Sequence, residues 1–165
     1  MNGTYRHSPE HDFLPRHDGR LELFQGFGSG FEGSLNARFM NFDAVDVDIY
    51  GLSLGRYWND WYVRGNLSRS QDTRNSQGTF GQLTVRNYYR VNNDDYWEGS
   101  VGLGKDQVNV GPTRQSLTQT TESFTLLWHR YWTRKWGTEL SYRYTGPDRS
   151  ATRQRVSVLV LRRWY

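Results

Sequence analysis

Cysteine is absent from this chain of 165 residues, which excludes disulfides, thiolate metal sites and cysteine nucleophiles. Long hydrophobic runs are absent as well. The best is VSVLVL at 156–161, far short of the ~20 apolar residues that a membrane helix needs. The first residues, MNGTYRHSPEHDF, lack the apolar core of a signal peptide. If the protein is exported, we therefore expect this sequence to be a mature chain or a fragment.

Lysine is scarce, so nearly all of the 21 basic residues are arginine, and the formal net charge is +4. A basic balance can indicate nucleic acid or anionic lipid as a partner. The arginines, however, are spread along the chain and recur at alternate positions, without a compact basic block. This spread favours arginines that pair with interior carboxylates or with lipid phosphates, and we expect no nucleic-acid partner.

Helical signals are nearly absent, and alternation with a period of two takes their place. In FEGSLNARF (31–39), Phe31 and Phe39 alternate with Glu32 and Arg38. The mean hydropathy is −0.86, but 16% of the residues are aromatic, which argues against disorder. We predict one all-β domain over 1–165, in which 1–18 supply a weakly marked first strand and a loop. The ten predicted strands are 2–7, 19–25, 30–42, 44–57, 60–69, 78–90, 95–105, 118–132, 135–145 and 152–165.

Short and long connections alternate along the predicted strands. The short turns, at 56–62, 88–97 and 130–137, have rings on both sides, whereas the stretches at 68–79, 105–120 and 145–152 are polar and predict long loops. Within 44–57 the apolar residues change parity, which predicts a bulge near Tyr50–Gly51.

The position of the rings decides which face of the strands meets lipid. A soluble core places its largest side chains in the middle of strands, whereas Trp and Tyr at strand ends are typical of a membrane interface. We therefore predict an antiparallel up-and-down transmembrane β-barrel of about 8–10 strands, with its apolar face outward. By loop parity, the C-terminus lies on the side of the short turns, which is the periplasmic side in outer-membrane barrels. Arg162 and Arg163 interrupt the apolar pattern of the last strand. The predicted aromatic girdle consists of Tyr57, Trp58, Trp61, Tyr88, Tyr89, Tyr96, Trp97, Tyr131, Trp132, Trp136, Trp164 and Tyr165.

The opposite, polar face carries charges of both signs, and we predict that they form an ion-paired ladder in the lumen. Eight strands leave an interior just wide enough for side chains, and buried charges need partners. A wide pore is therefore not expected, although an anion-selective path remains an alternative. The predicted ladder consists of Glu32, Arg38, Arg64, Arg86, Glu98, Glu139 and Arg143.

The sequence resembles the YaiO-type family of outer-membrane β-barrels in three stretches: LPRHDGRLELFQGFGSGFEGSLNARFMNFD (14–43), YGLSLGRYWNDWYVRGNLS (50–68) and LTVRNYYRVNNDDYWEGSVGLGKD (83–106). FLPRH (13–17) departs from the family, which more often has Leu before Phe-Pro. Family members usually carry further strands upstream, so the resemblance implies a truncated larger barrel or an internal start. It also implies an envelope system that exports or modifies surface polysaccharide. It supplies no catalytic residue.

Candidate reactive groups are few. His7, His11 and His17 lie close together near the N-terminus, but their spacing suits no defined ligand set, and we predict no metal site and no cofactor. His129 could serve a small membrane hydrolase or acyltransferase, but no nucleophile motif accompanies it, and a place beside the girdle is the preferred interpretation. We therefore predict a non-enzymatic structural, anchoring or narrow-pore component of the cell envelope. Its expected partners are outer-membrane lipid and polysaccharide or envelope proteins. The alternatives are a small outer-membrane lipid hydrolase or acyltransferase and a soluble lipocalin-like barrel.

Overall fold

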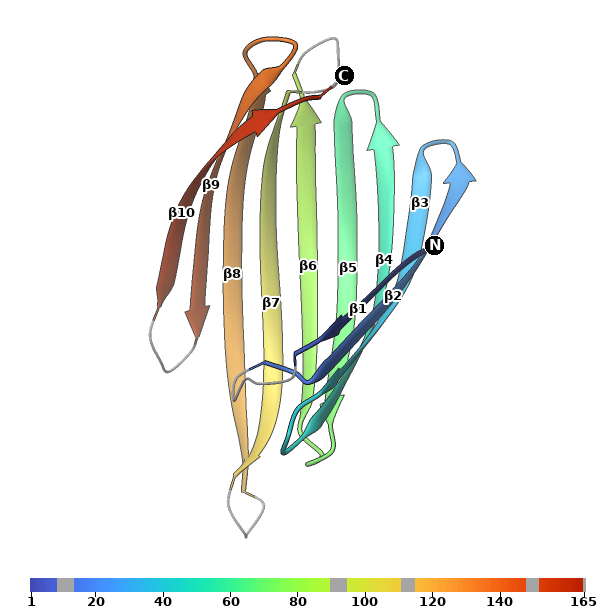
Figure 1. The fold of residues 1–165 in the computed structure, drawn as a ribbon, viewed down its shortest axis with the longest axis vertical. Helices are drawn as coiled ribbons and strands as arrows, with labels where there is room; N and C mark the ends of the chain where they lie inside the picture. Colours follow the sequence, from blue (N-terminus) through green and yellow to red (C-terminus); the bar gives the residue numbers. More distant parts are fainter. Residues whose placement is uncertain (9–13, 90–94, 111–114, 148–151, 165) are drawn as a thin grey trace.

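The computed structural model describes residues 1–8, 14–89, 95–110, 115–147 and 152–164, and its strands form one antiparallel sheet in chain order (Figure 1). Because each strand pairs with the next, the predicted all-β, up-and-down topology is confirmed. The described residues contain no helix that could cross a membrane. The strands are β1 (Asn2–His7), β2 (His17–Gly28), β3 (Phe31–Asn41), β4 (Asp46–Trp58), β5 (Trp61–Asp72), β6 (Gln77–Tyr88), β7 (Tyr96–Val110), β8 (Gln115–Tyr131), β9 (Trp136–Pro147) and β10 (Arg153–Arg162).

The register gives the sheet one polar and one apolar face. Ser34 of β3 lies opposite Ser53 of β4, and Leu35 lies opposite Leu52. The two serines are 4% and 3% exposed, whereas the two leucines are 58% and 56% exposed. Side chains converge on the concave side of a curved sheet and diverge on its convex side. The polar face is therefore the concave, lumen side, and the apolar face points outward.

β1 and β10 are the two edges of the sheet. β1 was only weakly marked in the sequence, but it pairs with β2 from Asn2 to His7. Within the described ranges, β1 pairs only with β2 and β10 only with β9. The sheet in Figure 1 is twisted and curved, and it is open between these two edges.

Tight turns join the strands at one end of the sheet. Ser29–Gly30 connects β2 to β3, and Asn59–Asp60 connects β4 to β5. Ser29, Gly30 and Asn59 have φ of 50°, 78° and 52°, as two-residue hairpin turns with a matching twist require. A Cβ at position 30 would collide with the carbonyl oxygen of Tyr57, so this turn needs glycine. We call this end, which also holds the β8–β9 connection, the turn end, and the opposite end the loop end.

The structure corrects the prediction of long loops at the loop end. β5 continues to Asp72 and β6 begins at Gln77, so most of 68–79 is strand. The polar stretch 105–120 likewise extends β7 and β8, on either side of residues 111–114, which are outside the described part. In Figure 1 the β7–β8 hairpin reaches the furthest point at this end. These extensions look like loops in sequence because they are rich in polar residues and turn formers, as expected for strands that leave the apolar band.

The predicted bulge at Tyr50–Gly51 is also wrong. The register of β4 runs through these residues without a shift against both β3 and β5. With this register, Val47 and Ile49 lie on the lumen side. This end of β4 lies beyond the apolar band, so its apolar residues need not face lipid. The register shift that the structure shows lies between Gly26 and Gly28, where β2 enters its turn.

Candidate functional site

All seven predicted ladder residues lie on the polar face of the sheet. The register connects this face across neighbouring strands, with Arg86 of β6 opposite Glu98 of β7 and Glu139 of β9 opposite His129 of β8. Several of these residues have partners outside the predicted set. The described contacts run along the wall, between strands that are close in the sheet.

Arg86 is the centre of the wall near the turn end. Its Nε and Nη2 donate to Oε2 of Glu98 at 2.8 and 2.5 Å, and its Nη1 donates to the hydroxyl of Tyr88 at 3.0 Å. The guanidinium also lies 4.2 Å from the ring centroid of Tyr96. The side chains of Arg86 and Glu98 are 28% and 20% exposed, so the pair is partly shielded from water. Charge-assisted bonds of this kind are stronger than neutral ones, and they tie β6 to β7.

A second cluster joins β2 to β5 through hydroxyl groups. Nη2 of Arg64 donates to Oγ of Ser34 at 3.0 Å and of Ser53 at 2.7 Å, and it lies 3.7 Å from a carboxylate oxygen of Glu22. The two serine hydroxyls are 2.6 Å apart, and Ser34 donates to Glu22 at 3.3 Å. Arg64 is therefore paired through Glu22, which the sequence analysis did not select.

Glu32 is held by a hydroxyl and not by an arginine. The Tyr62 hydroxyl donates to Oε1 of Glu32 at 2.6 Å. Tyr62 is 6% exposed and is the buried hydrophobic residue of the described part. The bond connects β5 to β3 across the intervening β4, which fixes the spacing of three strands.

At the loop end, Arg38 of β3 binds Asp18 of β2 in a bidentate pair, with both nitrogen–oxygen distances at 2.8 Å. Asp18 and Glu22 alternate with Leu21 and Leu23 in the sequence HDGRLELF, so their place on the polar face could have been predicted. Arg143 lies opposite Thr125 and Arg155, and none of the side-chain hydrogen bonds or ion pairs found among the described residues involves it.

Five tyrosines form an arc across the polar wall at the turn end. Tyr57 and Tyr62 have ring centroids 4.4 Å apart, and Tyr88 and Tyr96 are 5.7 Å apart. The ring of His129 stacks on Tyr96 at 4.8 Å and an interplanar angle of 8°, and it meets Tyr131 at 5.4 Å. We call Tyr57, Tyr62, Tyr88, Tyr96 and Tyr131 the tyrosine arc.

The arc corrects part of the girdle prediction. Tyr57, Tyr88, Tyr96 and Tyr131 were expected at the lipid face, but the register puts them on the polar face. Adjacent rings at a strand end, such as Tyr96 and Trp97, must point to opposite faces of the sheet, so they cannot belong to one belt.

Tryptophans gather on the apolar face of the sheet at the turn end, where the girdle is predicted. Trp97 and Trp128 lie 5.8 Å apart on the apolar face, and Trp132 meets Trp128 edge-on at 5.6 Å. Nε1 of Trp128, which the sequence analysis missed, donates to the hydroxyl of Tyr89 at 2.9 Å. Phe124, Leu126 and Trp128 occupy alternate positions of β8, and this alternation would have identified Trp128. The predicted members Trp58, Trp61, Trp136 and Trp164 are 46–77% exposed, and Tyr165 lies outside the described residues.

The apolar band between the two ends is a little shorter than the ~25 Å band of outer-membrane barrels. On β4, Trp58 at the turn end and Tyr50 at the loop end are eight residues apart on the same face. That separation corresponds to about 26 Å along the strand and roughly 20 Å along the membrane normal at a tilt of ~40°. At the loop end, Tyr50 meets Phe39 at 6.0 Å, and Arg69 lies opposite it on β5, where charge ends the band.

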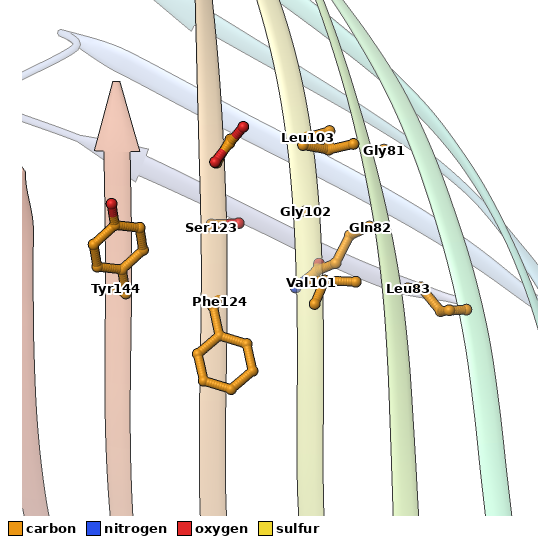
Figure 2. A pocket seen from close by; sticks show the side chains of 10 residues that line it. Gly81, Gln82, Leu83, Val101, Gly102, Leu103, Ser123, Phe124 and Tyr144 are labelled. Atoms are coloured by element: carbon orange, nitrogen blue, oxygen red, sulfur yellow. The ribbon is translucent and has the colours of Figure 1, made fainter. Parts of the chain in front are cut away.

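A hollow of about 610 Å³ lies in the middle of β6–β9, and Figure 2 shows the side chains that line it. Leu83, Val101, Phe124 and Tyr144, all of the apolar parity, contribute side chains to it. Gly81 adds no side chain, which leaves the space open. Glu122, Gln82 and Ser123 also line the hollow, so its mostly apolar wall includes polar groups. A mostly apolar hollow on the outward face suits an acyl chain.

The histidines, which are the candidate reactive groups, contact neighbouring side chains. Nδ1 of His129 is 3.2 Å from Oε2 of Glu139, on the lumen side and not at the lipid interface. Near the N-terminus, His7 and His17 have ring centroids 4.9 Å apart, whereas His11 lies outside the described residues. Within the described ranges no group of three His, Asp or Glu side chains could hold a metal ion.

The model of the YaiO membrane beta barrel domain matches residues 4–109, which is about two thirds of the chain. A comparison with curated proteins found no match. The matched region extends from β1 to near the end of β7 and includes Arg64, Arg86 and Glu98 of the polar wall. It agrees with the outward apolar band and the inward charges, and it argues against the soluble lipocalin-like alternative. The chain therefore belongs to the YaiO family of membrane β-barrel domains and is an outer-membrane β-barrel protein.

Proposed function

We propose that the protein is a structural, anchoring component of the bacterial outer membrane, in an envelope system that exports or modifies surface polysaccharide. The observation that carries this proposal is the set of contacts that the guanidinium of Arg86 makes. Its guanidinium is occupied by Glu98, Tyr88 and the ring of Tyr96, all from β6 and β7. An arginine with these partners holds strands together and has little capacity left to bind a passing anion.

Electrical recording of the reconstituted protein tests this role. We expect the wild-type chain, inserted into a planar bilayer, to give no steady ion conductance. A heat-dependent change in gel mobility on the same sample would establish that the barrel is folded. A stable, open conductance from the folded wild type would contradict the structural role.

A narrow polysaccharide passage is the second candidate, and the tyrosine arc favours it. Tyrosine rings offer flat apolar faces with a polar tip, a combination that suits the faces and hydroxyls of sugars. Tyr96, stacked on His129, lies in the middle of the arc. If the wild type conducts, oligosaccharides should block the current, and Tyr96→Ala should relieve the block. Tyr144→Ala, on the apolar face, is the matched control and should leave the block unchanged.

We also propose that the turn end and the C-terminus face the periplasm. The support is the pair of two-residue turns at this end and the polar strand extensions at the other, the usual asymmetry of outer-membrane barrels. Because the chain has no cysteine, a maleimide can label only the single cysteine that is introduced. In intact cells a membrane-impermeant maleimide should label Ser76→Cys at the loop end and spare Thr133→Cys at the turn end. The reverse labelling would invert the proposed orientation.

We propose that the barrel has no catalytic activity and that lipid, polysaccharide and envelope proteins are its partners. A lipid hydrolase or acyltransferase would need a hydroxyl nucleophile bonded to its histidine. His129 instead contacts Glu139, Tyr96 and Tyr131, and no serine hydroxyl bonds to it in the described part of the chain. Release of fatty acid from phospholipid by wild type, but not by His129→Ala, would contradict this assignment.

A further inference from the structure

Basic and aromatic side chains collect on the outer surface of the turn end, over β8, β9 and β10. The patch comprises three stretches, and we name it the basic–aromatic patch: Arg130 of β8, the segment Trp132–Trp136 that connects β8 to the first residue of β9, and Arg162–Trp164, which begins at the last residue of β10. The backbone N–H of Arg163 donates to the carbonyl of Lys135 at 2.8 Å, which fastens the C-terminal segment to the connection. Stretches that are about thirty residues apart in sequence therefore form one surface.

The connection itself is held in a defined shape. Trp132 and Thr133 both donate their backbone N–H groups to the carbonyl of Trp136, at 3.0 and 3.2 Å. The hydroxyl of Thr133 accepts from the backbone N–H groups of Lys135 and Trp136 at 3.3 and 3.0 Å. Arg134 and Lys135, between these bonds, are exposed.

The charge of the patch is one-sided. Its outward basic residues are Arg130, Arg134, Lys135 and Arg162, whereas the guanidinium of Arg163 lies 3.8 Å from the ring centroid of Tyr131, toward the polar face. In the sequences 128–140 and 156–165 the one acidic residue is Glu139. The side chain of Glu139 lies on the opposite, polar face, where it contacts His129. Among the described residues, none of the ion pairs found involves Arg130, Lys135 or Arg162.

The rings orient the cations. The guanidinium of Arg130 lies 4.1 Å from the ring centroid of Trp132, and that of Arg162 lies 3.7 Å from Trp164 and 5.2 Å from Trp136. A guanidinium stacked on a ring keeps its N–H edges available for an acceptor in the plane. Nε of Arg130 is buried and has no hydrogen-bond acceptor in the described part of the protein. The outer N–H edges of the stacked guanidinium groups of Arg130 and Arg162 are the donors that an anionic oxygen from outside the chain can meet.

The position of the patch identifies the source of that oxygen. Arg130 lies opposite Thr138 and Arg162 opposite Trp136, on the same face as Leu140 and Val158 of the apolar band. The patch therefore begins where the hydrocarbon ends, at the level of lipid headgroups. Arg130 and Arg162 lie two strands apart, which is roughly 10 Å, a span that the phosphates of one or two lipids can bridge.

We infer that the basic–aromatic patch is a binding site for the phosphate headgroup of anionic phospholipid. Arg130, Lys135 and Arg162 supply the donors, and Trp132, Trp136 and Trp164 hold the glycerol region. The choice of phospholipid as the source rests on the proposed orientation, which places the turn end in the phospholipid leaflet. Lipid bound at this site would hold the turn end of β8–β10 at the membrane surface, next to the open edge of β10.

The test compares two triple variants of the full chain in nanodiscs of phosphatidylcholine to which phosphatidylglycerol or cardiolipin is added. The patch variant is Arg130→Gln/Lys135→Gln/Arg162→Gln. The control variant, Arg69→Gln/Arg74→Gln/Lys105→Gln, removes the same charge at the loop end. Bound anionic lipid is measured by native mass spectrometry and by quenching of tryptophan fluorescence with brominated phosphatidylglycerol.

The wild type and the control should retain anionic phospholipid in preference to phosphatidylcholine. The patch variant should lose affinity about 100-fold at low salt, because each cation near an anionic surface changes binding by roughly fivefold. If the triple variant does not fold, the single Arg162→Gln should still lose about fivefold while Lys105→Gln does not. Equal losses in the patch and control variants, or no preference of the wild type for anionic lipid, would overturn the inference. Displacement of the phospholipid by lipopolysaccharide would overturn the choice of source and, with the maleimide labelling, show that the orientation is at fault.

Discussion

Replacing Arg86 tests whether the polar wall stabilises the barrel. Arg86→Gln removes two charge-assisted bonds to Glu98, one bond to the Tyr88 hydroxyl and the contact with the Tyr96 ring. Glu98 keeps its charge and loses its partner. Because both side chains are about a quarter exposed, the cost lies between that of an exposed pair, ~0–1 kcal/mol, and that of breaking a buried one, ~3–5 kcal/mol. We expect the free energy of unfolding to fall by about 2 kcal/mol.

A double-mutant cycle separates the pair from its surroundings. Glu98→Gln alone should also destabilise, whereas the double variant Arg86→Gln/Glu98→Gln should cost less than the sum of the two single changes, since it leaves no unpaired charge. Arg69→Gln is the control, because Arg69 is exposed and bonds only to Gln77 among the described residues. It should change stability by less than about 0.5 kcal/mol.

The assay is reversible urea unfolding of the refolded protein in lipid vesicles, followed by tryptophan fluorescence and by gel mobility. A loss below about 0.5 kcal/mol for Arg86→Gln, together with additive single changes, would refute the reasoning. It would mean that water in the lumen solvates Glu98 as well as the guanidinium does, and that the wall is not stabilised by its ion pairs.

Three further changes are tested by the same unfolding assay. Tyr62→Phe removes the donor to Glu32 and should cost about 1–3 kcal/mol, with no change in strand content by circular dichroism; a neutral effect would show that water replaces the hydroxyl. Gly30→Ala should cost about 1–3 kcal/mol and slow refolding, because the residue has φ +78° and its new Cβ would meet the Tyr57 carbonyl; unchanged stability would contradict the turn geometry. Leu54→Arg, near the middle of the apolar face, should cost about 2–4 kcal/mol in vesicles, and a much smaller cost would show that this face does not contact lipid.

The sequence and the structure agree best where the signal is local. Alternation with a period of two and tight turns predicted the number and order of the strands, because both depend on neighbours along the chain. The same alternation placed Arg86, Glu98 and Glu139 on one face, and the register agrees.

Sequence reasoning failed where the environment changes along a strand. The extensions of β7 and β8 were predicted as a loop because the stretch 105–120 is polar and rich in turn formers. A strand needs an apolar face only within the lipid, so its ends carry no such signal. The wrong prediction of a bulge at Tyr50–Gly51 has the same cause. The apolar residues of β4 were expected to stay on one face even beyond the end of the apolar band.

The sequence by itself determined that this is an all-β membrane chain with one apolar and one polar face, because these properties follow from residue type and spacing. Only the tertiary structure decided which groups meet. Arg64 reaches Glu22 and two serines, Tyr62 reaches Glu32, and Tyr96 faces the lumen while Trp97 faces lipid. The contacts of Arg64 with Glu22 and of Tyr62 with Glu32 join strands that are not neighbours in the sheet. They depend on register and curvature, which arise when the whole sheet forms. The partners of a charge are therefore set by the fold, even where the face on which it lies is set by the sequence.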